Sequence, residues 1–268
     1  MSTARLKSVN LPSGAVVVLR PMHVEELNLF ARMAGGAQKR VNKERYDGLI
    51  NVLQNCTVSV ESQGPFKDFK WAQSPDGDQM TGIFALRALT FGTTYPMKAQ
   101  CEHCGAKYDA LPTLLCKEEG GDLTVIPMGD EAKAALSNGT SVLAPFTLPS
   151  GTVVECRLIA GPQRKEATKL IEELASDPII AGLRARIVKM TLPDGTAVEP
   201  LDLTRAVRSM DAADVPAFKD YLADVDGGLD DYFATTCTEC GEENEANPMS
   251  FFGEGAFLGL SQKRRKTR

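Results

Sequence analysis

Two short stretches decide the fold of this chain: Cys101-Glu-His-Cys-Gly105 and Cys237-Thr-Glu-Cys-Gly241. A CxxC turn lets two thiolates point at one ion, and a following glycine permits the left-handed backbone that closes the turn. Zinc in structural sites takes four ligands in a tetrahedron, so two such turns supply a complete set. The sequence therefore predicts one structural zinc site, with Cys101, Cys104, Cys237 and Cys240 as its ligands.

We call each CxxCG stretch a knuckle. A second pair of matching stretches in the chain has nearly the same spacing as the two knuckles. Leu11-Pro-Ser-Gly14 precedes the run AVVVL and Leu148-Pro-Ser-Gly151 precedes TVVEC, an offset of 148 − 11 = 137 residues. The CxxCG knuckles are offset by 237 − 101 = 136 residues. Separate markers that keep one register indicate an internal duplication. We predict an α+β fold in which a unit of β-hairpin, helices and CxxCG knuckle occurs twice, the halves joined at a zinc-ribbon-like site of four cysteines.

The expected organisation is residues 1–135 as the first repeat, 136–262 as the second and 263–268 as a basic tail. Apolar residues at helical spacing predict helices within 24–34, 46–53 and 167–174, and β-branched runs predict strands at 16–19 and 153–158. A further helix is expected before each knuckle, one over 79–90 and one that Asp211 can cap. The second of these is expected to bury Val215, Phe218, Leu222 and Val225. We expect turns at 75–77 and 193–195 and a solvated turn at 224–231. The link between the halves is expected over 117–144, with exposed loop at KEEGGD (117–122) and SNGT (137–140).

Composition argues against several functional classes. The chain has a net charge of −5, a pI near 5.3 and 43% hydrophobic residues, so no overall positive field attracts nucleic acid or an anionic membrane. We find neither an apolar run that could cross a bilayer nor a signal-peptide pattern at the start, and expect a soluble protein. Four cysteine ligands would leave no open position on a zinc ion, and His23 and His103 are the two histidines. We therefore expect no enzymatic activity.

The remaining cysteines and the knuckle histidine have simpler interpretations. Cys56, Cys116 and Cys156 have apolar neighbours and are expected to be free buried thiols. His103, between two ligands, is expected to face solvent. The alternative of a redox dithiol requires the CxxC to open a helix. The following segments, GAKYDALP and GEENEANP, do not begin a convincing helix.

The C-terminal end of the chain combines apolar and basic residues. Phenylalanines and leucines crowd the glycine-rich stretch over 251–260, followed by Lys-Arg-Arg-Lys at 263–266. This segment is expected either to pack beneath the zinc site or to dock on a partner. The basic residues could contact phosphates or an acidic partner, or form a solubilising terminus.

The order of motifs in the first half resembles the baseplate hub or hub-assembly proteins of contractile-tailed bacteriophages, typified by the T-even phages. The resemblance lies in the LPSG turn, the stretch DQMTGIFALRALTFGTTY over 78–95 and the knuckle that follows at 101–105. It covers the first half well and extends less specifically to the second. It implies a non-enzymatic tail component, located in the virion baseplate and in the host cytoplasm during assembly.

Two functions follow as expectations. The first is a structural or assembly protein of the baseplate, binding hub, tube or wedge proteins in multiple copies around the tail axis, with no membrane partner. The second is a zinc-ribbon nucleic-acid-binding protein, which the knuckles and the basic tail favour and the acidic remainder opposes.

Overall fold

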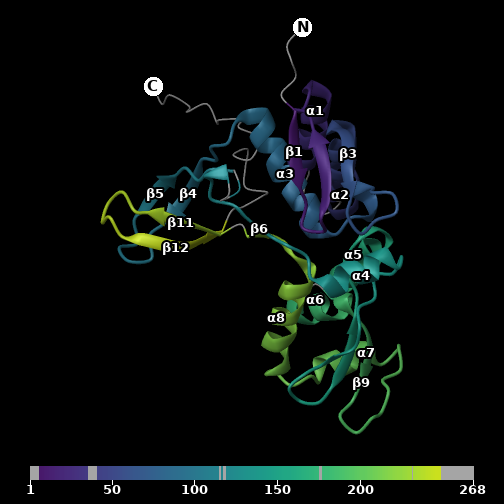
Figure 1. The fold of residues 1–268 in the computed structure, drawn as a ribbon. Helices are drawn as coiled ribbons and strands as arrows, with labels where there is room; N and C mark the ends of the chain where they lie inside the picture. The colour runs from purple at the N-terminus through teal and green to yellow at the C-terminus, as the bar shows by residue number, and fades with distance from the viewer. Residues whose placement is uncertain are drawn as a thin grey trace.

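The structure, a computed structural model, describes residues 6–35, 41–114, 116, 119–174, 177–230 and 232–248. The chain is mixed α and β with several small sheets, in which the named strands pair antiparallel. Two lobes combine a three-stranded sheet with helices, and two further hairpins lie to one side of them (Figure 1). The expected α+β composition is confirmed at this level. Among the described residues, no helix has the length and apolar character needed to cross a membrane.

The first lobe is built on a sheet of order β1-β2-β3. Its strands are β1 (Lys7–Asn10), β2 (Ala15–Leu19) and β3 (Thr57–Gln63), and its helices are α1 (Val24–Gly35), α2 (Val41–Cys56), the 3-10 turn η1 (Trp71–Gln73) and α3 (Asp76–Phe91). The apolar face of β2 and the buried residues of α3 form one core around Trp71. Trp71 packs so closely on α3 that a Cβ added to Gly82 would lie 2.5 Å from its ring.

The second lobe has a sheet of order β7-β8-β9. Its strands are β7 (Phe146–Thr147), β8 (Val153–Cys156) and β9 (Ile187–Thr191), and its helices are α5 (Gly161–Glu173), α6 (Pro178–Arg186), α7 (Leu203–Arg208) and α8 (Asp214–Asp226). Phe218 and Val225 of α8 are buried in this core, as the sequence predicts, while Val215 and Leu222 pack against it half-buried. Asp211 precedes the helix and accepts a hydrogen bond from the N–H of Ala213.

Both lobes attach the LPSG turn to a later helix in the same way. The N–H of Ser13 donates to Asp78 Oδ1 at 2.9 Å, in the first turn of α3. The N–H of Ser150 donates to Asp214 Oδ1 at 3.0 Å, at the start of α8. The serine spacing is 150 − 13 = 137 and the aspartate spacing is 214 − 78 = 136, matching the offsets in the sequence.

The link between the halves contains two elements that the sequence did not predict, while SNGT over 137–140 is exposed as predicted. It contains β6 (Thr124–Ile126), which pairs with β10 (Gly228–Asp230), and α4 (Asp130–Ser137), which packs on α8. Ala132 and Ala135 of α4 are buried in the second core, so the expected division after residue 135 falls inside this helix. The strand β6 and the helix α4 were not predicted because their partners lie about a hundred residues further on, which local composition does not reveal.

Two predicted turns are also wrong. The helix α3 begins at Asp76, directly after Pro75, so the Pro-Asp-Gly sequence there starts a helix. The acidic stretch near 224–230 is the end of α8 and the strand β10, and it is not a solvated turn. A Cβ on Gly227 would lie 2.5 Å from the backbone nitrogen of Met128, so the glycine permits a close backbone crossing. The Pro-Asp-Gly turn near Gly195, by contrast, is confirmed, with φ +84° at the glycine.

Candidate metal centre

Each CxxCG knuckle lies in the turn of a two-stranded hairpin. The first hairpin pairs β4 (Met97–Gln100) with β5 (Lys107–Ala110), and the second pairs β11 (Tyr232–Thr236) with β12 (Glu243–Pro248). The two hairpins lie together, apart from the helical lobes (Figure 1). An isolated two-stranded hairpin is at best marginally stable in water, so this unit needs a further source of stability.

The two turns have the same backbone hydrogen bonds. Cys101 N–H donates to Ala106 O at 2.8 Å and Gly105 N–H to Cys101 O at 2.9 Å. In the second knuckle Cys237 N–H donates to Glu242 O at 2.9 Å, and Gly241 N–H to Cys237 O at 3.0 Å. Both glycines have positive φ, +71° at Gly105 and +77° at Gly241. A residue with a Cβ would be strained there, which explains the glycine in each motif.

The four predicted ligands converge. The Sγ atoms of Cys101, Cys104, Cys237 and Cys240 all lie within 4.8 Å of one another. Cys101 Sγ is 3.6 Å from Cys240 Sγ, and Cys104 Sγ is 3.8 Å from Cys237 Sγ. A tetrahedron with Zn–S bonds of about 2.3 Å has edges of about 3.8 Å. These distances are far too long for disulfide bonds, which are about 2.05 Å, and all four thiols are free.

The contacts between the sulfurs cross from one knuckle to the other. Each hairpin contributes one buried cysteine, Cys101 or Cys237, and one exposed cysteine, Cys104 or Cys240, and each buried sulfur touches the exposed one of the opposite knuckle. An ion bound at the centre would therefore join residues more than 130 positions apart. The geometry fits a closed, four-thiolate metal site, and this ligand set is consistent with zinc.

The thiols are electrostatically coupled. Desolvation raises the pKa of Cys101, but hydrogen bonds from the backbone N–H groups of Cys104 and His103 outweigh this and lower that pKa to about 6. The backbone N–H of Glu242 lowers the pKa of Cys240, but desolvation and the three neighbouring thiols raise it to about 12. One thiolate thus opposes the ionisation of another, and a divalent cation between them would remove that opposition.

Side chains outside the two motifs brace the knuckles against each other. Asn244 is almost fully buried, and its Oδ1 accepts a hydrogen bond of 2.7 Å from the N–H of Glu102 in the opposite knuckle. The hydroxyls of Tyr108 and Thr235 lie 2.7 Å apart, joining β5 to β11. Sequence reasoning missed these three residues. Tyr108 and Asn244 are 244 − 108 = 136 residues apart, the same offset as the two knuckles, so the repeat register could have marked their positions but not their contacts across the two hairpins.

His103 and the backbone around both knuckles agree with the sequence predictions. His103 is exposed, with Nε2 3.3 Å from the carbonyl oxygen of Glu243, so it lies outside the four sulfurs as predicted. Neither CxxC opens a helix, since each lies between two strands, and the structural context for a redox dithiol is therefore absent at both knuckles.

The other three cysteines lie elsewhere. Cys56 and Cys156 are buried free thiols, and burial raises the pKa of each to about 11, which keeps them unreactive. Cys116, expected to be buried, is half-buried. The phenylalanine-rich stretch and the basic tail after residue 250 lie outside the described residues.

Comparison with known proteins gives no match to a family model, a curated protein or a solved structure.

Proposed function

We propose that this chain is a structural or assembly component of a contractile phage tail baseplate, in its hub region, stabilised by one structural zinc ion. The observation that carries the structural part is the closed cluster of four cysteine sulfurs. Four protein ligands leave no coordination position for water or substrate, so such an ion holds two segments together and performs no chemistry. The placement in a baseplate rests on the resemblance of the first half to that family.

We also infer that the two lobes are a duplication joined at a zinc-ribbon-like site of four cysteines. Equivalent serine–aspartate hydrogen bonds in the two lobes and identical turn bonds in the two knuckles support this inference. The inference suits a scaffold, because a duplicated chain offers two related surfaces to neighbouring proteins. The partners would be hub, tube or wedge proteins, with several copies placed around the tail axis.

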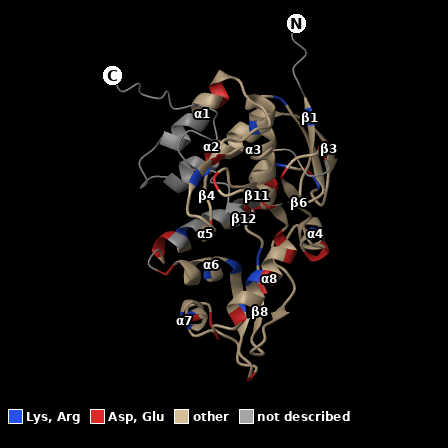
Figure 2. Cartoon of the chain, turned by 90° about the vertical axis from the view of Figure 1, so that its left-hand side faces the viewer, with Lys and Arg blue, Asp and Glu red and all other residues tan. Residues whose placement is uncertain are grey.

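The alternative, a nucleic-acid-binding zinc ribbon, is opposed by the charge of the knuckles. Four exposed glutamates lie on or beside the turns: Glu102, Glu239, Glu242 and Glu243. In addition, four thiolates around a divalent ion carry a net charge of −2. Lysine and arginine are scattered among acidic residues and form no single basic face in the view of Figure 2. Phosphate binding requires concentrated positive charge, and the described part of the knuckles does not supply it.

The metal hypothesis is tested by native mass spectrometry of the purified protein. One zinc ion per chain is expected, and Cys101→Ser should lose it because structural zinc requires its full ligand set. The matched control is His103→Ala, which changes the same turn but removes no ligand and should keep the ion. A chain without zinc, or loss of zinc from both variants, would contradict this site.

The functional hypothesis is tested in particles of the phage that encodes the chain. Quantitative mass spectrometry should detect the protein in tails or tail-assembly intermediates, with hub, tube or wedge proteins bound to it. Its absence from both would overturn the baseplate role, even if the zinc site is correct. DNA or RNA binding that weakens steeply with salt would instead favour the nucleic-acid function.

A further inference from the structure

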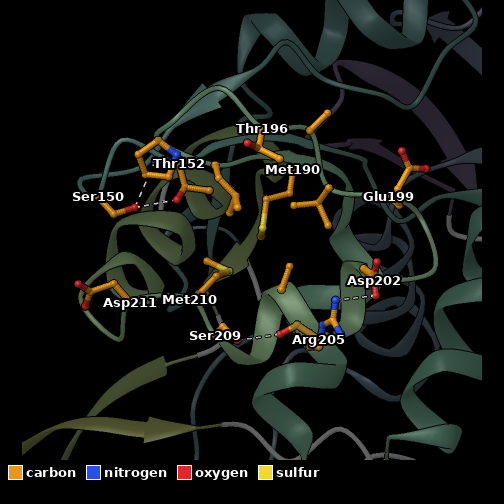
Figure 3. A pocket seen from close by; sticks show the side chains of 15 residues that line it. Ser150, Thr152, Met190, Thr196, Glu199, Asp202, Arg205, Ser209, Met210 and Asp211 are labelled. Carbon is orange, nitrogen blue, oxygen red and sulfur yellow. Dashed lines mark hydrogen bonds and ion pairs between the residues drawn. The ribbon is translucent and has the colours of Figure 1, made fainter.

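A pocket of ≈ 590 Å³ lies at the edge of the second lobe (Figure 3). Its walls are the turn around Ser150, the segment over 190–199 and the end of α7 with the residues that follow it. The lining includes the apolar side chains of Met190, Leu192, Val198 and Met210. Figure 3 shows Met190 and Met210 directed into the space from different walls. Such a lining suits an apolar side chain from another segment.

The rim of this pocket is acidic. Asp202 Oδ1 and Arg205 Nη2 form an ion pair with a distance of 3.0 Å. The negative charge of Asp202 therefore balances the positive charge of Arg205. Glu199 and Asp211 lie on opposite sides of the opening in Figure 3, and within the described ranges no ion pair joins either of them to a basic side chain. The lining therefore carries one positive and three negative groups, a net charge of −2. A basic segment would be attracted to it.

The two lobes differ at one position of the repeat that lies at this pocket. Phe69 stands 78 − 69 = 9 residues before Asp78, and Arg205 stands 214 − 205 = 9 residues before Asp214. The Phe69 ring is buried and packs edge-on against Phe66 and Trp71, with centroids 5.4 and 5.1 Å away. In the second lobe, the arginine at this position lies at the rim. At this position of the repeat, the first lobe therefore has a buried phenylalanine and the second lobe has an arginine that lines the pocket.

We propose that this pocket binds the C-terminal segment of the chain, FFGEGAFLGLSQKRRKTR over 251–268, with phenylalanine or leucine inside and the basic run against the rim. The segment lies outside the described residues. It carries three phenylalanines, five basic residues and one acidic residue. Apolar anchors beside positive charge are what an apolar pocket with an acidic rim selects. The inference uses the inferred duplication and does not depend on the baseplate role.

Photo-crosslinking in the full-length protein tests the proposal. A photoreactive amino acid replaces Thr196, which is exposed and lines the pocket. After irradiation and digestion, mass spectrometry should find crosslinked peptides from residues 251–268. The matched control carries the same group at Val24, which is 71% exposed on α1 of the other lobe, and should yield far fewer of these peptides. Equal yields at the two positions, or crosslinks from Thr196 to other segments alone, would overturn the proposal.

A charge reversal tests the role of the acidic rim. Glu199 and Asp211 are exposed, so the double variant E199K/D211K should fold, which its circular dichroism and zinc content verify. We expect at least a fivefold lower yield of the 251–268 crosslink in this variant, and a similar fall for the natural rim at high salt, because exposed charges are screened. An unchanged yield in the folded variant would refute the proposed charge complementarity.

Discussion

The buried carboxyl of Asp78 is expected to make the stability of the first lobe depend on pH. Asp78 is fully buried in the first turn of α3; its Oδ1 accepts from Ser13, and its Oδ2 has no hydrogen-bond partner. Burial raises the pKa of this carboxyl from 3.8 to about 6, although the hydrogen bonds from Ser13 oppose the shift. The folded protein therefore holds this proton more tightly than the unfolded chain.

The sign and size of the effect follow from this shift. Protonated Asp78 stabilises the folded state relative to the unfolded chain. This contribution to the free energy of unfolding is fully present below about pH 4 and is lost as the pH rises through about 6. A shift of about 2 pKa units corresponds to about 3 kcal/mol, at about 1.4 kcal/mol per unit. Relative to the variant Asp78→Asn, which cannot ionise, the natural protein should thus lose about 3 kcal/mol in its free energy of unfolding between pH 4 and pH 8.

Urea unfolding of both proteins, followed by tryptophan fluorescence across this range, measures the difference. Trp71 is the single tryptophan and lies in the first core, so its signal reports on this lobe. Subtracting the free energy of unfolding of the variant from that of the natural protein removes the pH dependence due to the thiols and the other carboxyls, because the two proteins share these groups. Asp214→Asn serves as the matched control, because Asp214 Oδ1 and Oδ2 both accept hydrogen bonds from Ser150. A natural-minus-variant difference that stays constant from pH 4 to pH 8 would refute the reasoning.

Three further outcomes are expected. Removing zinc with a chelator should raise amide exchange in both hairpins, over 97–110 and 232–248, while the cores of the lobes stay protected; protection that persists in either hairpin contradicts the shared site. Gly82→Ala should lower the free energy of unfolding by about 1–3 kcal/mol, because the ring of Trp71 is held by a 2.8 Å bond from Nε1 to Thr57 Oγ1 and cannot easily retreat. The control Gly182→Ala, in a helix with no atom within 4 Å of the new Cβ, should be neutral or up to about 1 kcal/mol stabilising; equal effects in urea titrations would refute the clash. Asn244→Ala should cost about 1–3 kcal/mol in the stability of the hairpin pair, because it leaves the N–H of Glu102 unpaired, and thermal unfolding of the zinc-loaded protein measures this.

The sequence predicted the parts of the site whose geometry is local. A CxxCG knuckle specifies its own turn, because Gly105 and Gly241 permit the positive φ that closes it and the two intervening residues place both sulfurs on one side. The β-branched run after the LPSG turn likewise predicted β2, and apolar spacing predicted the buried side of α8. These features depend on neighbours within a few residues, so they can be read without the fold.

Contacts between distant segments could not be read in this way. The strand β6 is three residues long and pairs with β10 about a hundred positions later, and nothing within either segment marks the other. Gly77 and Gly228 look like turn residues, yet a Cβ on Gly77 would lie 2.8 Å from the Cα of Gly228, so α3 and β10 pack closely at this point. A glycine signal is ambiguous between a turn and a close approach, and only the packing distinguishes them.

The sequence by itself therefore determined which four cysteines form the site and the turn that presents each pair. The sequence also predicted that the two knuckles meet, from their repeat offset. Only the tertiary structure decided how they meet, with each buried sulfur against the exposed sulfur of the opposite knuckle and with Asn244 and Tyr108 bracing them. The physical reason is the sequence separation over which the deciding interactions act. Turn conformation is set by backbone sterics over four or five residues, whereas the meeting of the hairpins is set by the packing of the whole chain between them.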